Sequence, residues 1–551
     1  MLITRSIAAA ALAVSLATMP VCLAGEEKPD TKAPTDKATD KTGDKTAEKP
    51  APAEVTTDGT VEAGGQHVAY TAIAGTLTVG ASDIQDAQLG LDGKPQADSQ
   101  LSLDAPKEPK DAPATARMFY VAYFKKDAKA EDRPITFLYN GGPGAATVWL
   151  HMGSVGPKHV VTDTDTHLPA APYKLVDNTN SLLDVTDLVF IDMPGTGFGR
   201  LTGKDAGKAF WGIDEDGNAF ARFIARFITK YSRWNSPKFL FGESYGTTRS
   251  AVLADILENK QNIDLNGVIL LSQIFNFTTD IDVPNANPGV DLPYVLGLPT
   301  YAATAWYHKK LPTQPPALEP FLKEVEEFTN GPYAHALALG TDISAEEKQA
   351  VAEKLHAYTG LPVAYLLKAD LRVSGGEFEK TLQDDEGMTT GRLDTRFSGP
   401  SIDPLSQAAD YDPQSAAISS AYVSLFNDYV RKTLKYGEGQ TYIPQALFDG
   451  TQWDFKHRDN PVSVNVAPDL AEAMKTNPRL KVMVNGGYYD LATPFFAAEY
   501  EEKHLPIPQS LAKNIEYDWY ESGHMVYVRD ESLKQLHDRV AAFITKTDAK
   551  P

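Results

Sequence analysis

The chain contains a serine in a setting that is typical of a catalytic nucleophile. Ser244 is the central residue of Gly242-Glu243-Ser244-Tyr245-Gly246, a G-x-S-x-G pattern. The apolar run at residues 239–241 favours a buried strand before this pattern, and residues 250–258 continue with a helical pattern. A serine on a sharp strand-to-helix turn is exposed above the sheet edge, and only small flanking residues leave room for the turn. We therefore predict that Ser244 is a nucleophile; an ordinary tight turn is the alternative.

A base and an acid for this serine follow two expected strands later in the chain. Residues 482–484 lead into a glycine-rich turn that ends at Asp490, and residues 514–520 lead into a second turn that contains His524. A serine hydroxyl needs a base to accept its proton, and the imidazole needs a carboxylate to fix its tautomer. The order Ser244, Asp490, His524 is that of α/β-hydrolases. We predict that the three residues form a catalytic triad at one edge of a sheet.

A second glycine-rich turn could supply donors for a developing negative charge. The sequence Asn140-Gly141-Gly142-Pro143-Gly144 follows the apolar run at residues 135–139. Acyl transfer needs backbone N–H groups that point at the oxyanion of the tetrahedral intermediate. We predict that the amides of Gly142 and Tyr245 form this oxyanion hole; a purely structural loop is the alternative.

The elements that must position these residues alternate between strands and helices. The expected strands are residues 68–79, 117–124, 135–139, 188–191, 239–241, 268–271, 482–484 and 514–520. Helical stripes recur at residues 220–228 and 533–544, and the helix-like stretches 318–329 and 345–359 lie between the serine and the aspartate. Such alternation favours a mostly parallel sheet with helices on both faces. The predicted fold class is α/β, an α/β-hydrolase fold with an inserted, largely helical cap.

Five motifs together resemble those of the serine carboxypeptidases, peptidase family S10. They are Asn140 to Gly144, Asp192-Met193-Pro194-Gly195-Thr196-Gly197-Phe198, Gly242 to Gly246, the turn ending at Asp490, and Gly523-His524-Met525-Val526. The resemblance covers residues of about 135–275 and 479–545. It implies an enzyme that releases C-terminal residues from peptides through an acyl-enzyme intermediate.

The resemblance also implies roles for individual residues. The family's triad and oxyanion amides map onto the residues predicted above. Asn140 and Glu243 are implied to hydrogen-bond the free C-terminal carboxylate of a peptide substrate. A glutamate must be protonated in order to donate to a carboxylate. The negative charge of that carboxylate raises the pKa of the glutamate, which explains the acid preference of the family.

The chain departs from the family pattern at several positions. Family members carry a second glutamate where this chain has Ser154, so only one glutamate of the family's pair is present. We expect Glu243 to titrate alone, so that C-terminal trimming persists nearer to neutral pH than in relatives with both acids. Residues 247–249, Thr-Thr-Arg, replace a usual Ala-Gly run, and Tyr527 replaces a usual proline. The disulfides of eukaryotic relatives are absent, because the single cysteine is Cys22.

The first residues have the pattern of an export signal. Arg5 precedes an apolar run at residues 7–17, and small residues lead to Ala24, after which we expect cleavage. The apolar run is shorter than the ~20 residues that span a bilayer, so an uncleaved anchor is the weaker interpretation. Lipidation of Cys22 is a further alternative, although Val21 is bulkier than such processing sites usually tolerate. We expect an exported protein, periplasmic or secreted, without a transmembrane span in its mature form.

The predicted organisation has five parts. Residues 1–24 are the signal peptide. Residues 25–55 are a charged linker with too little apolar surface to fold, so we expect them to be disordered. The α/β-hydrolase core is expected at residues 56–284 and 471–551, and the cap is expected at residues 285–470 between them.

Composition narrows the possible partners and leaves some alternatives open. The 551 residues include 73 acidic and 52 basic side chains, a formal net charge of -21. Such a surface repels phosphate backbones, so we expect a peptide substrate and no nucleic acid. No cofactor is expected, and the acids and histidines at residues 159–167 lack the spacing of a metal site. The alternatives to a serine carboxypeptidase are a proline-iminopeptidase-like or esterase-type hydrolase of the same fold, and a binding protein that has the fold but catalyses no reaction.

Overall fold

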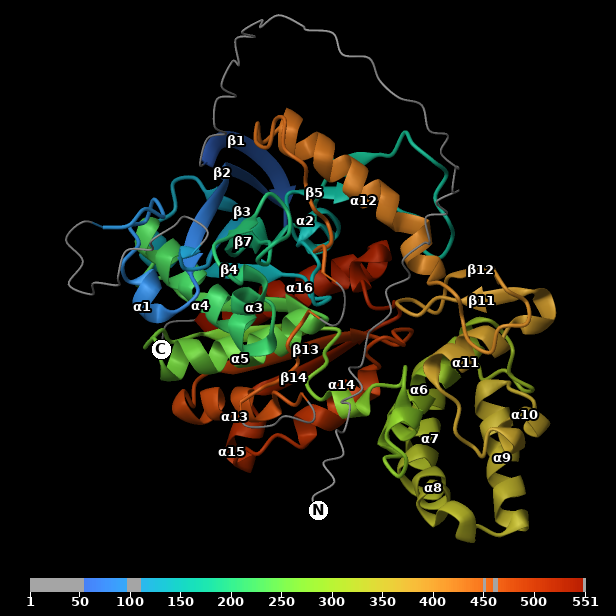
Figure 1. Cartoon of the computed structure of the whole chain (residues 1–551). Coiled ribbons are helices and arrows are strands. Elements are labelled where there is room, and N and C mark those ends of the chain that lie inside the picture. The colour runs from blue at the N-terminus through green and yellow to red at the C-terminus, as the bar shows by residue number, and fades with distance from the viewer. Residues whose placement is uncertain (1–53, 97–110, 449–451, 459–463, 549–551) are drawn as a thin grey trace, which may run out of the picture.

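The computed structural model describes residues 54–96, 111–448, 452–458 and 464–548 (Figure 1). The predicted signal peptide lies outside the described residues. The predicted linker also lies outside them except for its last two residues, which already belong to the first strand.

A central sheet runs through the main body of the molecule (Figure 1). Its strands lie in the order β1-β2-β3-β7-β4-β9-β10-β13-β14, and β8 pairs with β3. Their bounds are β1 Glu54–Ala63, β2 Gln66–Gly80, β3 Thr115–Lys125, β4 Ile135–Tyr139, β7 Asp187–Ile191, β8 Arg200–Thr202, β9 Lys238–Glu243, β10 Gly267–Leu271, β13 Lys481–Gly487 and β14 Ile515–Tyr520. The strands from β7 to β14 in this order are all parallel, whereas β1, β2 and β3 pair antiparallel at one end. The predicted, mostly parallel sheet is confirmed.

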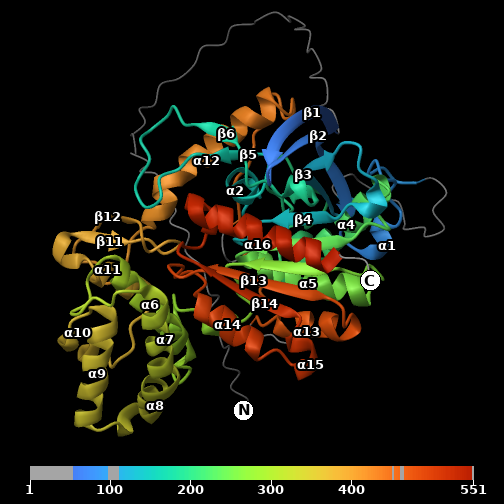
Figure 2. The ribbon, with the colours of Figure 1, turned by 180° about the vertical axis from the view of Figure 1, so that it is seen from behind.

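Helices cover both faces of this sheet, which explains why β4, β7, β9 and β10 are buried along their whole length and mostly apolar. One face packs against α3, α4, α5 and α13, and the other packs against α2, α12 and α16 (Figure 2). The bounds of these helices are α2 Val148–Gly153, α3 Ala206–Phe210, α4 Ile213–Lys230, α5 Tyr245–Asn259, α12 Pro413–Lys432, α13 Ala467–Thr476 and α16 Asp530–Asp548. Short elements complete the main body: α1 Asp83–Asp86, β5 Lys158–Val160, β6 Leu175–Asp177, α14 Phe495–Lys503 and α15 Gln509–Ala512. The α/β-hydrolase fold predicted from the sequence is confirmed by this architecture.

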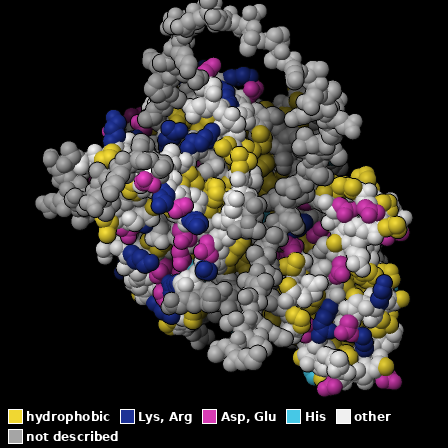
Figure 3. Space-filling model, viewed as in Figure 1, with side chains coloured by type: hydrophobic (Ala, Val, Ile, Leu, Met, Phe, Trp, Pro, Cys, Tyr) yellow, Lys and Arg dark blue, Asp and Glu magenta, His cyan; other side chains and the backbone are white. Residues whose placement is uncertain are grey.

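A lobe of helices projects from the main body beside α14 (Figures 1 and 2). It contains α6 Leu292–Tyr307, α7 Leu318–Phe328, α8 Ala334–Leu339, α9 Ala345–Thr359, α10 Val363–Lys368 and α11 Gly375–Thr381, followed by the hairpin of β11 Met388–Thr390 and β12 Ser398–Pro400. The lobe has its own apolar cluster, which also takes in Tyr488, Tyr489 and Leu491 around the Asp490 turn. Acidic and basic side chains are spread over both the lobe and the main body (Figure 3).

The interval predicted as a cap, residues 285–470, contains elements of two kinds. The helices α6 to α11 form the lobe, whereas the later helix α12 packs against α2 and joins the apolar cluster that contains β3 and β7. The limits of the cap remain a prediction.

Candidate active site

The structure places Ser244 at the sharp turn between β9 and α5. Its backbone has φ 61° and ψ −132°, a conformation that residues with a side chain rarely adopt. The Ser244 amide donates to Leu271 O at 2.9 Å, which ties the turn to the neighbouring strand β10. A Cβ atom at Gly242 would lie 2.1 Å from Gly246 O, so the tight turn excludes side chains at that position. The local geometry is that of a nucleophile elbow.

Asp490 and His524 form the second part of the site. His524 Nδ1 donates to Asp490 Oδ2 at 2.8 Å, and both side chains are buried. Thr493 adds two bonds to the same carboxylate, from its hydroxyl to Oδ2 at 2.7 Å and from its amide to Oδ1 at 2.9 Å. Three donors therefore hold the carboxylate in one orientation, and the carboxylate in turn orients the imidazole.

The electrostatic surroundings keep the His524 imidazole basic. Burial alone would lower the pKa of His524, but the charge and the hydrogen bond of Asp490 outweigh it, and the Glu243 carboxylate adds to their effect. The pKa of His524 is therefore raised above its ordinary value. Such an imidazole is suited to accept a proton from a serine hydroxyl.

The four strands that carry these turns bring them to one edge of the sheet. β9, β10, β13 and β14 are consecutive parallel neighbours, so their carboxyl ends lie side by side. The Ser272 hydroxyl, after β10, donates to His524 O at 2.7 Å and spans the gap between the Ser244 and His524 turns. Within the described residues no hydrogen bond joins Ser244 to His524; such bonds commonly tighten only when substrate binds.

The glycine-rich turn after β4 packs directly on the Ser244 elbow. A Cβ atom on Gly141 would lie 2.4 Å from Tyr245 N and 2.6 Å from Gly246 N. Gly142 has φ 109°, in the left-handed region that favours glycine. The turn that carries Gly142 and the amide of Tyr245 are thus adjacent, as an oxyanion hole requires.

Arg249 is the last residue of the Thr-Thr-Arg sequence that departs from the family pattern, and it links the turn after β4 to helix α4. Its Nε donates to Asp216 Oδ2 at 2.6 Å, and both side chains are fully buried. Its Nη1 donates to Asn140 O at 2.7 Å, and the guanidinium stacks on Phe220. Because α5 also carries the elbow, Arg249 couples the position of Asn140 to that of Ser244.

Asn140 and Glu243 meet at the same edge. Asn140 Nδ2 donates to Glu243 Oε1 at 2.9 Å, and its Oδ1 accepts from Leu150 N at 3.0 Å. Burial raises the pKa of Glu243 to about 7. The positive charge of His524, the nearby Tyr527 hydroxyl and the hydrogen bond of Asn140 oppose this rise.

Ser154 stands where the resemblance implies a second glutamate. Its side chain is buried and donates to Leu150 O at 2.6 Å, directly after the end of α2. A Cβ atom on the adjacent Gly153 would lie 2.4 Å from the Tyr422 hydroxyl and 2.7 Å from the Tyr527 ring. Two tyrosines therefore fill the space beside α2 that faces Glu243.

These tyrosines leave a small group of unsatisfied polar atoms. Glu243 Oε2 and the hydroxyls of Tyr422 and Tyr527 are buried and have no well-formed hydrogen bond within the described part of the chain. The Tyr527 hydroxyl nevertheless lies close enough to Glu243 to lower the pKa of that carboxyl. Buried polar atoms without partners are costly, so a water molecule or a polar ligand that reached these three atoms would be stabilised there.

Sequence reasoning missed three contributors to the site. It did not single out Thr493, whose position three residues after Asp490 is a recognisable signal for a turn that caps a carboxylate. It noted Tyr527 only as a departure from a family pattern. Finally, it gave no sign that residues 392–396, from the region of the lobe, contact both the Asp490 turn and the His524 turn.

The described residues contain no group of three or more His, Cys, Asp or Glu side chains that could hold a metal ion. They also contain no helix long and apolar enough to cross a membrane.

Comparisons with known proteins agree with the motifs and the geometry. A family model described as serine carboxypeptidase matches residues 110–536. A serine carboxypeptidase-like protein of Oryza sativa subsp. japonica is 28% identical over 133 residues, which are 24% of this chain and 28% of that protein. The pheromone-processing carboxypeptidase KEX1 of Saccharomyces cerevisiae is 31% identical over 135 residues, which are 23% of this chain and 17% of that protein. Both matches thus span less than a third of the relative's own length.

Among solved structures, the peroxisomal alpha-beta-hydrolase Lpx1 of Saccharomyces cerevisiae is 9% identical, with a TM-score of 0.32 over 87% of this chain and 92% of that one. The strand order supports the fold, and the family model supports the family to which the chain is assigned. Since the family model spans more than half of the sequence, the chain belongs to the serine carboxypeptidase family.

Proposed function

We propose that this protein is an exported serine carboxypeptidase that removes C-terminal residues from peptides through an acyl-enzyme intermediate. The observation that carries the proposal is the buried Asp490–His524 hydrogen bond, 2.8 Å long, at the sheet edge where Ser244 occupies a strained elbow. Family membership supports the same reaction.

In the proposed reaction Ser244 Oγ attacks the carbonyl carbon of the last peptide bond. His524 Nε2 accepts the serine proton, while Asp490 holds the imidazole in the tautomer that leaves Nε2 free. The amides of Gly142 and Tyr245 stabilise the oxyanion. His524 then gives the proton to the leaving amine, and water hydrolyses the ester that remains on Ser244.

Asn140 and Glu243 give the reaction its direction along the peptide. A protonated Glu243 and the Asn140 amide can both donate to a terminal carboxylate, and the pKa of Glu243, about 7, keeps it largely protonated in mildly acidic solution. Because Glu243 Oε1 accepts from Asn140, the Glu243 proton is carried by Oε2, and the Tyr527 hydroxyl offers one further donor for such a carboxylate.

A pair of blocked peptides tests the proposal. We expect cleavage of a peptide with an acetylated N-terminus and a free C-terminus, with single residues released from the C-terminal end in mass spectra. Cleavage only of a peptide with a free N-terminus and an amidated C-terminus would instead establish an aminopeptidase of the iminopeptidase type. Hydrolysis of simple esters without either peptide would establish an esterase.

Labelling by a fluorophosphonate tests the nucleophile separately. We expect the reagent to modify the wild-type protein at Ser244 and to leave Ser244→Ala unmodified, which would exclude an inert binding protein. Export is tested by N-terminal sequencing of the secreted or periplasmic protein, for which we expect the first residue after Ala24.

A further inference from the structure

Residues 392–396 connect β11 to β12 at the base of the helical lobe, far in sequence from both catalytic turns. Their backbone forms hydrogen bonds to each turn. His524 N donates to Leu393 O at 2.7 Å, and Leu491 N donates to Arg392 O at 3.1 Å. Thr395 N donates to Tyr489 O at 2.9 Å. The segment therefore lies between the Asp490 turn and the His524 turn and is bonded to both.

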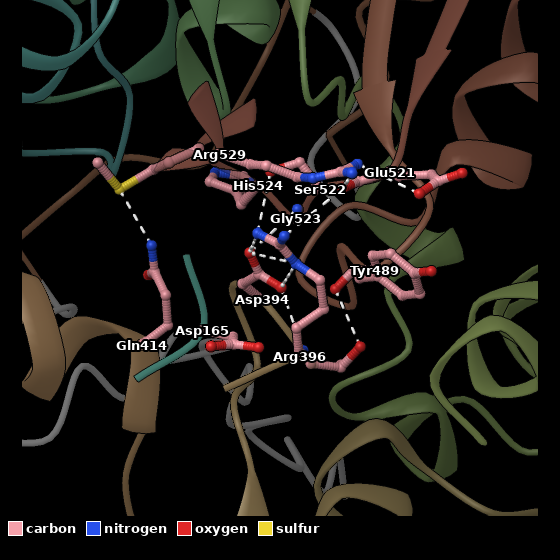
Figure 4. Close-up of polar contacts among 12 residues, drawn as sticks. Asp165, Asp394, Arg396, Gln414, Tyr489, Glu521, Ser522, Gly523, His524 and Arg529 are labelled. Carbon is pink, nitrogen blue, oxygen red and sulfur yellow. Dashed lines mark hydrogen bonds and ion pairs between the residues drawn. The ribbon is translucent and has the colours of Figure 1, made fainter. Parts of the chain in front are cut away.

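Two charged side chains of this segment strengthen the link to the His524 turn (Figure 4). Asp394 Oδ2 accepts from Gly523 N at 3.1 Å. Arg396 holds the Asp394 carboxylate with Nε at 2.9 Å from Oδ1 and Nη2 at 2.5 Å from Oδ2. Arg396 Nη2 also donates to Ser522 Oγ at 3.1 Å. The ion pair thus contacts both residues that precede the catalytic histidine.

Asp394 of this segment packs tightly against Gly523 of the His524 turn. A Cβ atom on Gly523 would lie 2.4 Å from both Cβ and Cγ of Asp394. Only glycine fits before His524, because the Asp394 side chain occupies the space that a larger residue would need. Figure 4 shows the Asp394 carboxylate and the Arg396 guanidinium directly beside Ser522, Gly523 and His524.

The ion pair is almost completely excluded from water, since Asp394 is 0% and Arg396 3% exposed. Burial of two charges costs free energy that a bidentate pair only partly recovers, so such a pair is weak evidence for a contribution to stability. Its geometry is directional, however, and it limits how the groups bonded to it can move.

We propose that Asp394 and Arg396 are positioning residues that hold the 522–524 turn so that His524 stays aligned with Asp490. The proposal rests on the proposed function only in that His524 is the catalytic base. The same segment also contacts α6, through Thr395 Oγ1 and Thr304 Oγ1 at 2.6 Å, and the residue that follows α6, through His308 Nε2 and Thr395 O at 2.6 Å. The lobe is therefore attached to the catalytic turns.

Replacement of Asp394 by asparagine tests this role in the full-length protein. Asp394→Asn keeps the shape of the side chain and an oxygen for Gly523 N, but it removes the charge that holds Arg396. We expect kcat to fall about 10- to 100-fold with KM changed less than about twofold, because a catalytic group displaced by less than 1 Å loses rate rather than substrate affinity. The rate of Ser244 labelling by a fluorophosphonate should fall by the same factor.

Asp187→Asn is the matched control. Asp187 pairs with Arg233 at 2.6 Å and with Arg133 at 3.1 Å, with similar burial, at the start of β7 and therefore at the opposite edge of the sheet. We expect this control to lower the midpoint of thermal unfolding at least as much as Asp394→Asn and to leave kcat unchanged. Equal loss of kcat in both variants would show a general effect of stability and would overturn the proposal.

Two further measurements keep the test decisive. Ser522→Ala removes one bond of Arg396 without unpairing a charge, and it should lower kcat about threefold to tenfold even if Asp394→Asn does not fold. Proton NMR should show a strongly downfield resonance from the Asp490–His524 hydrogen bond in the wild type, and this resonance should shift or broaden in both variants. An unchanged resonance and unchanged kcat in Ser522→Ala would contradict the proposal.

The NMR signal also separates this inference from the proposed function. A wild-type protein that trims no peptide C-terminus, but whose resonance is altered by Ser522→Ala, would refute carboxypeptidase activity and support the positioning role. Absence of the resonance from the wild-type protein would refute the alignment on which both depend.

Discussion

Asn140 Nδ2 donates a 2.9 Å hydrogen bond to Glu243 Oε1, which joins the glycine-rich turn after β4 to the residue before the proposed nucleophile, 103 positions later in the chain. The bond holds a buried carboxyl group, with its pKa raised to about 7 by burial, at the edge where a peptide terminus would bind. The protonation state of Glu243 should therefore control turnover in a measurable way.

Turnover of peptides with a free carboxylate should decline as the pH rises through about 7. Above the pKa of Glu243 its negative charge repels the substrate carboxylate, whereas below that pKa its proton can be donated to it. In Glu243→Gln this decline should disappear, since the amide donates at every pH. The measurement is kcat/KM against pH, with an ester that lacks a carboxylate as the control substrate. A steep loss between about pH 5 and 6 that survives Glu243→Gln would contradict the assignment.

The same substitution should make the base available at lower pH. The Glu243 carboxylate is one of the charges that raise the pKa of His524, so its removal lowers that pKa. We expect the rising limb of the fluorophosphonate labelling rate, plotted against pH, to move to lower pH in Glu243→Gln. A rising limb at the wild-type position would show that the two groups do not interact.

Tyr527→Phe should change the pH at which the turnover of peptides declines. The Tyr527 hydroxyl lowers the pKa of Glu243, so its removal should raise that pKa and move the decline to higher pH. The phenyl ring keeps the packing of this buried position. Tyr301→Phe is the control, because it removes a buried hydroxyl that donates to Val373 O at 3.0 Å in the lobe. Equal pH profiles for Tyr527→Phe and the wild type would exclude a role for this hydroxyl.

Thr493→Val should lower kcat without a large change in KM. The substitution preserves shape but removes the 2.7 Å hydrogen bond to Asp490 Oδ2, a bond to a charged group worth about 1.5 kcal/mol or more, which corresponds to about tenfold in rate. Steady-state kinetics on a blocked peptide measures the effect. Thr359→Val removes a buried hydroxyl bond to Leu355 O at 2.7 Å in α9 and should leave kcat unchanged. A wild-type kcat in Thr493→Val would mean that the Thr493 amide orients Asp490 by itself.

Gly141→Ala should impair the stabilisation of the oxyanion. Its new Cβ would lie 2.4 Å from Tyr245 N, so the turn carrying Gly142 must move away from the elbow. We expect kcat to fall about 100-fold, which is typical for loss of one oxyanion donor. Gly331→Ala is the control, since its Cβ would meet open space. Thermal unfolding should show that Gly141→Ala remains folded; a folded variant with normal kcat would argue against an oxyanion hole at this turn.

Local patterns in the sequence were sufficient to predict much of the main body. The run Ile135 to Tyr139 is a strand with those bounds, and the helical pattern at residues 345–359 is α9 with those bounds. Strands buried on both faces read as short, continuous apolar runs, and their positions need no knowledge of distant contacts. The same applies to the Ser244 elbow, because glycine spacing within five residues permits the turn.

Only the tertiary structure decided which of these local elements meet. The order of the strands places Asp490 beside His524, but the bonds from Thr493 and the contact of Tyr527 with Glu243 depend on side-chain packing between turns. Residues 392–396 carry no motif at all, and their hydrogen bonds to the Asp490 turn and the His524 turn arise because a segment from the lobe returns to the sheet edge. A sequence encodes local propensity in neighbouring residues, whereas contacts across more than a hundred residues depend on how the whole chain excludes water from its core.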